Sequence, residues 1–163
     1  MKPIEILEPT QRQPSKAYLV NALRNAIAGW RKQGYPNTTP TTQRLLQYWF
    51  KEDHLLDREP FEFWFCQREA IETLIYVYEV MKKRNFIDMA RDFGAGPIQS
   101  YDPSYDQYPL YAFKMATGSG KTKVMSLAVV WSYFHALREE GSTLARDFLI
   151  VAPNIIVFER LKE

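Results

Sequence analysis

The feature that most limits what this chain can fold into is a glycine-rich segment between an apolar run and a longer amphipathic stretch. The segment reads Met115-Ala116-Thr117-Gly118-Ser119-Gly120-Lys121-Thr122. The apolar run at 110–115 predicts a buried strand, and the stretch at 121–140 predicts a helix. A second apolar run at 147–152 predicts another strand. Strand, helix and strand in this order predict a parallel βαβ unit, which is typical of an α/β fold.

The glycine-rich segment has the residue types that a triphosphate site requires. Gly118 and Gly120 allow unusual dihedrals and have no Cβ that would keep a phosphate from the backbone. A helix that begins near Lys121 directs its positive end toward the phosphates, and the Lys121 ammonium adds a full charge. The Thr122 hydroxyl is a ligand for Mg²⁺. Met115 stands where the strict phosphate-loop (Walker A) pattern has glycine or alanine.

We therefore predict a set of phosphate-binding residues, of which Lys121 and Thr122 would also act in catalysis and Thr122 would hold the metal. The set is Thr117, Gly118, Ser119, Gly120, Lys121 and Thr122. The alternative for this segment is a surface turn with an incidental lysine. Its position between a predicted strand and a predicted helix favours the phosphate site.

A second candidate residue, Gln67, stands at the start of a helix predicted at 67–84. Its carboxamide offers an acceptor and two donors in one plane, which matches the N6 donor and N7 acceptor of adenine. Guanine presents two acceptors there and fits less well. Taken alone, a glutamine at a helix start is more often a solvated residue. Upstream of a phosphate loop, it predicts an adenine contact.

The part before the glutamine predicts a small helical unit. Three prolines indicate an extended arm over residues 1–14. Ser15 would cap a first helix that stops at Gly34, and a second helix would start at Thr39 or Thr41. Further on, residues 88–109 carry glycines and prolines that predict a long loop.

Composition excludes several other classes of protein. A single cysteine, Cys66, rules out a disulfide framework and a cysteine-rich zinc module. The longest apolar run is too short to span a bilayer, and the first residues lack an apolar signal segment. We therefore expect a cytoplasmic protein without a membrane partner. The net charge of +2 is too small to indicate a nucleic-acid partner by itself.

Two motifs together resemble those of superfamily 2 helicases and translocases. They are Gln67-Arg68-Glu69-Ala70-Ile71-Glu72-Thr73-Leu74 and Ala116-Thr117-Gly118-Ser119-Gly120-Lys121-Thr122. The later run Phe148-Leu149-Ile150-Val151-Ala152-Pro153-Asn154 is similar to the next motif of that superfamily. Within it, the glycine-rich string is most similar to the motor subunits of type I and type III restriction enzymes, and the continuation over 155–159 looks like the type III Res group. The resemblance covers about residues 61–163.

This resemblance implies an ATP-driven motor of the DEAD/DEAH type that moves on duplex DNA. Residues 61–163 would form the incomplete N-terminal part of a RecA-like ATP-binding lobe, preceded by a helical accessory region at 1–60. Gln67 would contact adenine, and Pro153 and Asn154 would lie near the DNA backbone. ATP and Mg²⁺ would be the cofactors. A nuclease or methyltransferase subunit would be a further partner.

The resemblance leaves one position of the adenine site open. The family often places an aromatic or basic residue, upstream of the glutamine, against the adenine ring. Phe50, Phe61 and Phe63 are all candidates, and the sequence does not choose between them.

Hydrolysis requires groups that the sequence does not supply. A carboxylate must hold Mg²⁺ and orient water, and an arginine must stabilise the developing charge. No Asp-Glu or Glu-Asp pair follows Thr122. We therefore expect this chain to bind adenine nucleotide weakly, to leave it unhydrolysed, and to be part of a larger motor. Two alternatives stay open: a P-loop phosphotransferase of another class, and a non-catalytic interaction module that nucleotide stabilises.

Overall fold

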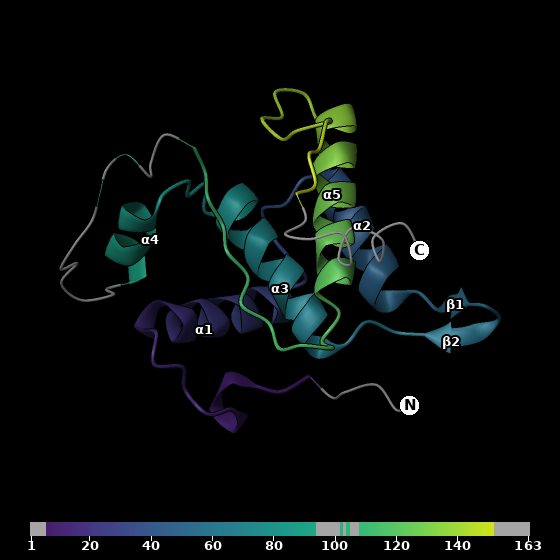
Figure 1. Cartoon of the computed structure of the whole chain (residues 1–163), viewed down its shortest axis with the longest axis horizontal. Helices are drawn as coiled ribbons and strands as arrows, with labels where there is room; N and C mark the ends of the chain where they lie inside the picture. Colours follow the sequence, from purple (N-terminus) through teal and green to yellow (C-terminus); the bar gives the residue numbers. More distant parts are fainter. Residues whose placement is uncertain (1–5, 94–101, 103, 105–107, 152–163) are drawn as a thin grey trace.

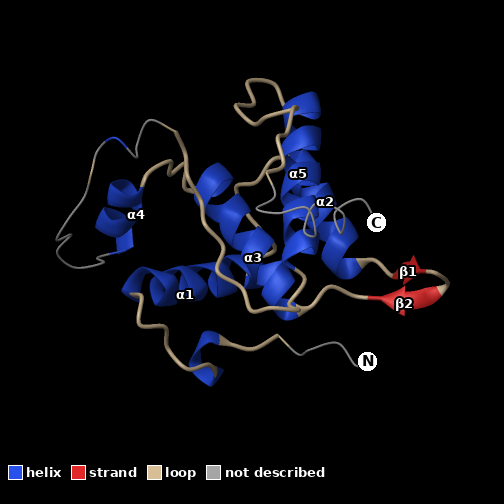
Figure 2. Ribbon diagram, viewed as in Figure 1, coloured by secondary structure: helices blue, strands red, loops and turns tan. Residues whose placement is uncertain are grey.

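The computed structural model describes residues 6–93, 102, 104 and 108–151, and these residues form mainly helices (Figures 1 and 2). The elements in chain order are a 3₁₀ turn at Pro9–Gln11, α1 at Tyr18–Lys32, α2 at Pro40–Lys51, β1 at His54–Leu56, β2 at Glu59–Phe61, α3 at Phe65–Ile75, a π-helical turn at Tyr76–Val80, α4 at Phe86–Phe93 and α5 at Lys121–Arg138.

The first two long helices agree with their predicted positions, and the caps explain the details. Thr39 caps α2, because its hydroxyl accepts a hydrogen bond from the Thr42 N–H at 3.3 Å, and Pro40 takes the first helical position. Ser15 does not cap α1. Its backbone instead pairs with the Asn21 side chain, which accepts from the Ser15 N–H at 2.7 Å and donates to its carbonyl at 2.8 Å.

The helix predicted at 67–84 is present but changes its geometry. It begins at Phe65, loses α-helical spacing after Ile75 and continues as one π-helical turn to Val80. Lys82 then adopts a positive φ of 54°, which ends the helix. The π turn places Glu79 against the start of α2, where its carboxylate accepts hydrogen bonds from the Thr39 N–H and the Thr42 hydroxyl.

The long loop predicted over 88–109 is wrong in its first part, because α4 occupies Phe86–Phe93. Asn85 supplies a cap that the sequence reasoning overlooked, since its side chain accepts from the Asp88 N–H at 2.8 Å. Most of the remainder lies outside the described residues.

The strands are the main difference from the sequence prediction. The only sheet within the described residues is the antiparallel hairpin of β1 and β2, in which His54 faces Phe61. The runs predicted as strands at 110–115 and 147–152 contain no strand over their described residues, which end at 151. A strand needs a neighbour for its hydrogen bonds, and neither run pairs with the other. The parallel βαβ unit is therefore not shown, although its helix, α5, is.

The hydrophobic core is shared by the four long helices. It consists of Ile27, Trp30, Tyr35, Leu46, Trp49, Ile71, Ile75, Leu127 and Trp131. Helix α3 lies between α1 and α5, and α2 packs along α5 (Figure 1). The core thus combines residues from both sides of the boundary predicted at residue 60, and that domain boundary stays a prediction. Within the described residues, no helix has the length and apolarity to cross a bilayer.

Candidate nucleotide site

The predicted phosphate residues meet in one turn at the start of α5. Gly118 and Gly120 both adopt a φ of 78°, and Gly120 is the residue that precedes the helix. Ser119 closes the turn, because its hydroxyl donates to the Ala116 carbonyl at 2.7 Å and its N–H to the same oxygen at 3.3 Å. The free N–H groups of a helix start and its dipole favour an anion at this end.

The Lys121 side chain folds back over this turn. Its ammonium donates to the Ala116 carbonyl at 2.9 Å and to the Met115 carbonyl at 3.4 Å. Lys121 and Thr122 are both exposed. The cation is therefore held over the loop by neutral carbonyls, which a phosphate oxygen would outcompete as charge-assisted acceptors. Met115 takes part through its backbone, so the unusual side chain at this position does not disturb the contact.

Gln67 lies against the loop and joins it to α3. Its Nε2 donates to the Ser119 carbonyl at 3.1 Å, while its Oε1 accepts from the Trp64 N–H at 3.0 Å. The residue is only 8% exposed. One amide proton and part of the oxygen's accepting capacity remain for another partner. The structure thus brings Gln67 and the phosphate loop together, and the adenine contact stays a prediction.

The two glycines of the loop are required for different reasons. A Cβ on Gly120 would lie 2.2 Å from Gln67 Nε2, so the close approach of Gln67 depends on glycine there. A Cβ on Gly118 would meet nothing within 4 Å among the described residues, and only the positive φ favours glycine at that position. Phosphate approach, the reason predicted for both glycines, therefore does not account for the contact between Gly120 and Gln67.

The aromatic residues upstream of Gln67 separate into two groups. Phe61, at the end of the hairpin, contacts α5, because Lys123 Nζ lies 5.3 Å from the centroid of its ring. Phe50 instead lies under the Arg68 guanidinium, at 4.9 Å. Phe63 packs between them, 5.0 Å from the Phe61 centroid and 5.7 Å from that of Phe50. Of the three candidates, Phe61 is the one seen in contact with the first turn of α5.

The residues of the loop fit a magnesium nucleotide only in part. No group of three or more histidine, cysteine or acidic side chains that could hold a metal occurs within the described residues. The chain therefore offers the Thr122 hydroxyl, and the phosphate oxygens of a nucleotide would supply further ligands. This is a set that Mg²⁺ accepts, because it usually keeps several waters.

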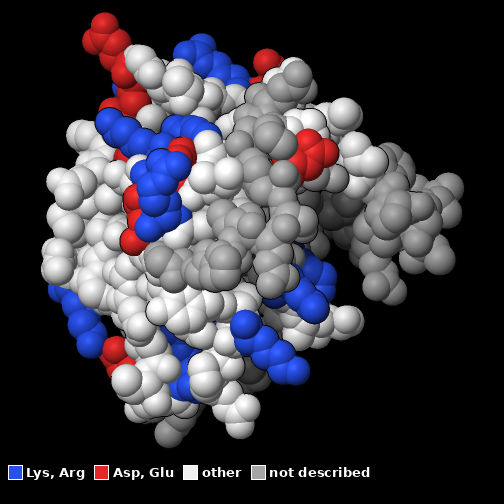
Figure 3. Space-filling view, turned by 90° about the vertical axis from the view of Figure 1, so that its left-hand side faces the viewer, with Lys and Arg blue, Asp and Glu red and all other residues white. Residues whose placement is uncertain are grey.

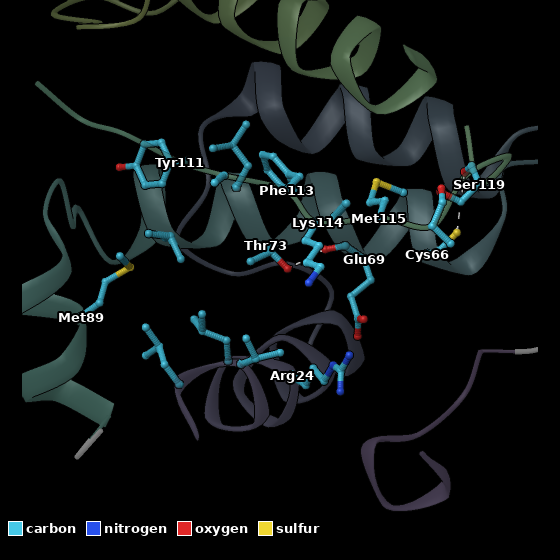
Figure 4. Close-up of a pocket in the computed structure, with 18 of the residues that line it drawn as sticks. Arg24, Cys66, Glu69, Thr73, Met89, Tyr111, Phe113, Lys114, Met115 and Ser119 are labelled. Atoms are coloured by element: carbon cyan, nitrogen blue, oxygen red, sulfur yellow. Dashed lines mark hydrogen bonds between the residues drawn. The ribbon is translucent and has the colours of Figure 1, made fainter. Parts of the chain in front are cut away.

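An apolar cavity of about 570 Å³ lies behind the loop (Figure 4). Its walls come from α1, α3, Met89 of α4 and the extended segment 110–116, and it reaches Cys66 and Ser119 at one end. The sequence reasoning did not foresee this cavity, because it assigned 110–115 to a sheet. Cys66 Sγ lies 3.9 Å from the Ser119 carbonyl, so the thiol also packs against the phosphate turn.

A buried ion cluster on α3 was also missed. Glu72 is completely buried and accepts hydrogen bonds from Arg31 of α1, from Arg68 and from the Tyr35 hydroxyl. Burial, and next the Glu72 charge, raise the pKa of Tyr35 well above its usual value. The sequence signal is a glutamate, Glu72, within the apolar pattern of α3, next to the buried Ile71.

The predicted nucleic-acid contacts, Pro153 and Asn154, lie outside the described residues. In the upper part of the face shown in Figure 3, basic and acidic side chains lie next to each other, whereas the lower part shows separate basic side chains. This agrees with the small net charge of +2. The proposal of a DNA partner therefore rests on the sequence motifs.

Comparison with known proteins identifies a family. A family model described as "Type III restriction enzyme, res subunit" matches residues 61–163. The matched part contains Gln67 and the whole phosphate loop, which the structure brings together. No curated protein and no solved structure matches the chain.

Proposed function

Because the chain belongs to the type III restriction enzyme res subunit family, a family of helicase-like ATPases, we propose that residues 61–163 bind ATP with Mg²⁺. In this proposal the same residues form part of a RecA-like lobe with a parallel sheet, and residues 1–60 are its helical accessory region. In the complete motor, ATP hydrolysis would drive movement on duplex DNA.

One observation carries the proposal: the Lys121 ammonium lies over a turn of backbone at a helix start, where it donates to the Ala116 and Met115 carbonyls. A triphosphate in this place would replace two neutral acceptors by charged oxygens and gain the N–H groups of the turn. The exposure of Thr117, Gly118 and Lys121 leaves the turn open to a ligand.

Each residue of the site has a proposed role. The backbone of Thr117 to Gly120 holds the phosphates, Lys121 moves from the carbonyls to them, and the Thr122 hydroxyl is a ligand for Mg²⁺. The metal, when bound, neutralises charge on the phosphates. Gln67 uses its second amide proton and the remaining accepting capacity of its oxygen to hold the adenine edge, and Phe61 provides an aromatic face beside it.

The further parts of the proposal rest on the family alone. Pro153 and Asn154 would lie near the DNA backbone, and a nuclease or methyltransferase subunit would act with the motor. Turnover by this chain is not proposed, because no Asp-Glu or Glu-Asp pair follows Thr122 to hold the metal and orient water.

The test is binding of ATP by the purified chain, measured by calorimetry with and without Mg²⁺. We expect weak binding that Lys121→Ala abolishes and Thr122→Ala weakens only when Mg²⁺ is present. Arg138→Ala is the matched control, since it removes a cation from the opposite end of the same helix. Unchanged ATP binding in the Lys121→Ala variant would overturn the proposal.

A further inference from the structure

The N-terminal arm reaches across the molecule to the first turns of α3. Arg12 makes a bidentate ion pair with Glu69, at 2.7 and 2.8 Å. Both side chains are largely buried, at 14% and 15% exposure. A paired and desolvated fork of this kind fixes the orientation of both partners, unlike an exposed ion pair.

The same arginine also packs on the aromatic residue that begins α3. The Arg12 guanidinium carbon lies 5.1 Å from the centroid of Phe65, and that of Arg31 lies 5.2 Å from it. Phe65 is buried and precedes Gln67 by two residues. Two cations from the N-terminal part thus hold the turn of α3 that presents Gln67.

The position of Arg12 has a cost. Its Nε is buried and has no hydrogen-bond partner within the described part of the chain. A buried donor without a partner is unfavourable. The contacts with Glu69 and Phe65 therefore have to outweigh this penalty, which makes the arm a specific contact with α3.

Gln67 transmits the position of α3 to the phosphate loop. Its two hydrogen bonds join the Trp64 backbone, before α3, to the Ser119 backbone in the loop. Gln67 Nε2 lies 2.2 Å from the point where a Cβ on Gly120 would stand, so the side chain packs directly on the loop backbone at the glycine. A rotation of the first turn of α3 would therefore change the Gln67 contact with the loop.

We propose that Arg12 is a positioning residue of the nucleotide site: its contacts with Glu69 and Phe65 set the first turn of α3, and hence the placement of Gln67. This assigns a role to the N-terminal arm through the contacts of Arg12 with α3. The inference rests on the proposed function, because it concerns the affinity of the same site for nucleotide.

A double-mutant cycle separates positioning from a merely structural role. ATP affinity is measured for the wild-type chain, Arg12→Ala, Gln67→Ala and the double variant. If Arg12 acts through Gln67, we expect Arg12→Ala to weaken ATP binding about fivefold in the wild-type background and to have no effect in the Gln67→Ala background. Effects that multiply in the double variant would overturn the inference.

A charge-reversed pair and a control variant test whether the effect is specific to the ion pair of Arg12 with Glu69. Arg12→Glu with Glu69→Arg restores the ion pair with reversed charges and should recover most of the affinity. The control is Lys32→Ala. It removes the ion pair between Lys32 of α1 and Glu8 of the arm, in which the lysine side chain is 65% exposed. It should leave the affinity unchanged, and a loss equal to that of Arg12→Ala would also overturn the inference.

The outcomes also separate this inference from the proposed function. If the wild-type chain binds no ATP, or binds it independently of Lys121, the proposed function and the inference both fail. If wild-type binding depends on Lys121 but Arg12→Ala does not weaken it, only the inference fails. Thermal unfolding of each variant is recorded first, so that affinity is compared between folded proteins.

Discussion

The helical core and the apolar runs on either side of α5 differ in the partners that their side chains and backbone find. In the core, polar groups pair across the helices: the Trp131 indole donates to the Thr42 hydroxyl, which donates to Glu79. In the run after α5, apolar side chains stay exposed, and Leu149 reaches 89%. A helix satisfies its backbone within itself, whereas a strand depends on a neighbour. The polar groups of the core therefore find partners on the elements packed beside them, such as Thr42 of α2 and Trp131 of α5.

The largest expected effect concerns Glu72, the buried carboxylate of the core. Glu72→Ala would leave the Arg31 and Arg68 guanidinium groups without their main partner in the core, and we expect the free energy of unfolding to fall by about 3–5 kcal/mol. Urea unfolding followed by circular dichroism measures this. Glu140→Ala, at an exposed site beyond α5, is the control and should change the stability by less than about 0.5 kcal/mol. Equal values for the two variants would show that the ion cluster is not a core contact.

The two loop glycines give the next largest effect and refine the comparison at the site itself. Gly120→Ala brings a Cβ to within 2.2 Å of Gln67 Nε2, and a positive φ is unfavourable as well. Gly118→Ala has only the positive φ, at about 1–2 kcal/mol. We expect Gly120→Ala to lower the stability more than Gly118→Ala. Because the clash involves Gln67, the additional Gln67→Ala exchange should remove most of the difference between the two glycines.

The helices of the core could be predicted from the sequence better than the strands beside α5. Helices α2 and α5 could be predicted, because Thr39-Pro40 and the glycine before Lys121 mark their starts locally. The apolar pattern at 110–115 and 147–152 could not establish strands by itself, because strand pairing depends on two segments that are distant in the sequence.

In the candidate site, the loop could be predicted from its residue order, while the role of Gly120 could not. That role depends on Gln67, which is far away in the sequence and reaches the loop only through the packing of α3 on α5. The same reason hid Arg12 and Glu69. An ion pair between distant segments leaves no local signal in the sequence.

A substitution in the run after α5 tests whether its exposed apolar side chains contribute to stability. Leu149→Lys exchanges an exposed apolar side chain for a charged one, and we expect a change in the free energy of unfolding within about 0.5 kcal/mol. Ile71→Ala, in the core, should cost about 2–5 kcal/mol under the same conditions. A loss above about 2 kcal/mol for Leu149→Lys would mean that this run is buried, as in the parallel sheet that we propose for the lobe.

The smallest expected effect concerns the link between α2 and the end of α5. Glu139 accepts a hydrogen bond from the Thr41 N–H at 2.9 Å, and this contact holds the pKa of its carboxyl below the usual value near 4.5. A lowered pKa in the folded state means that the stabilisation is complete above about pH 4.5 and is lost as the pH falls through the folded-state value. Because the carboxyl is largely solvated, the contribution is about 0.5 kcal/mol or less.

Glu139→Gln removes the titrating group and keeps an acceptor for the Thr41 N–H. We expect the variant to lose less stability than the wild-type chain between pH 5 and pH 3, as followed by urea unfolding at each pH, while the two remain similar near pH 7. Identical pH profiles would mean that the carboxylate contributes nothing as a charge. In that case the hydrogen bond alone joins α2 to α5 at this position, and the charge of Glu139, unlike that of the buried Glu72, does not contribute to stability.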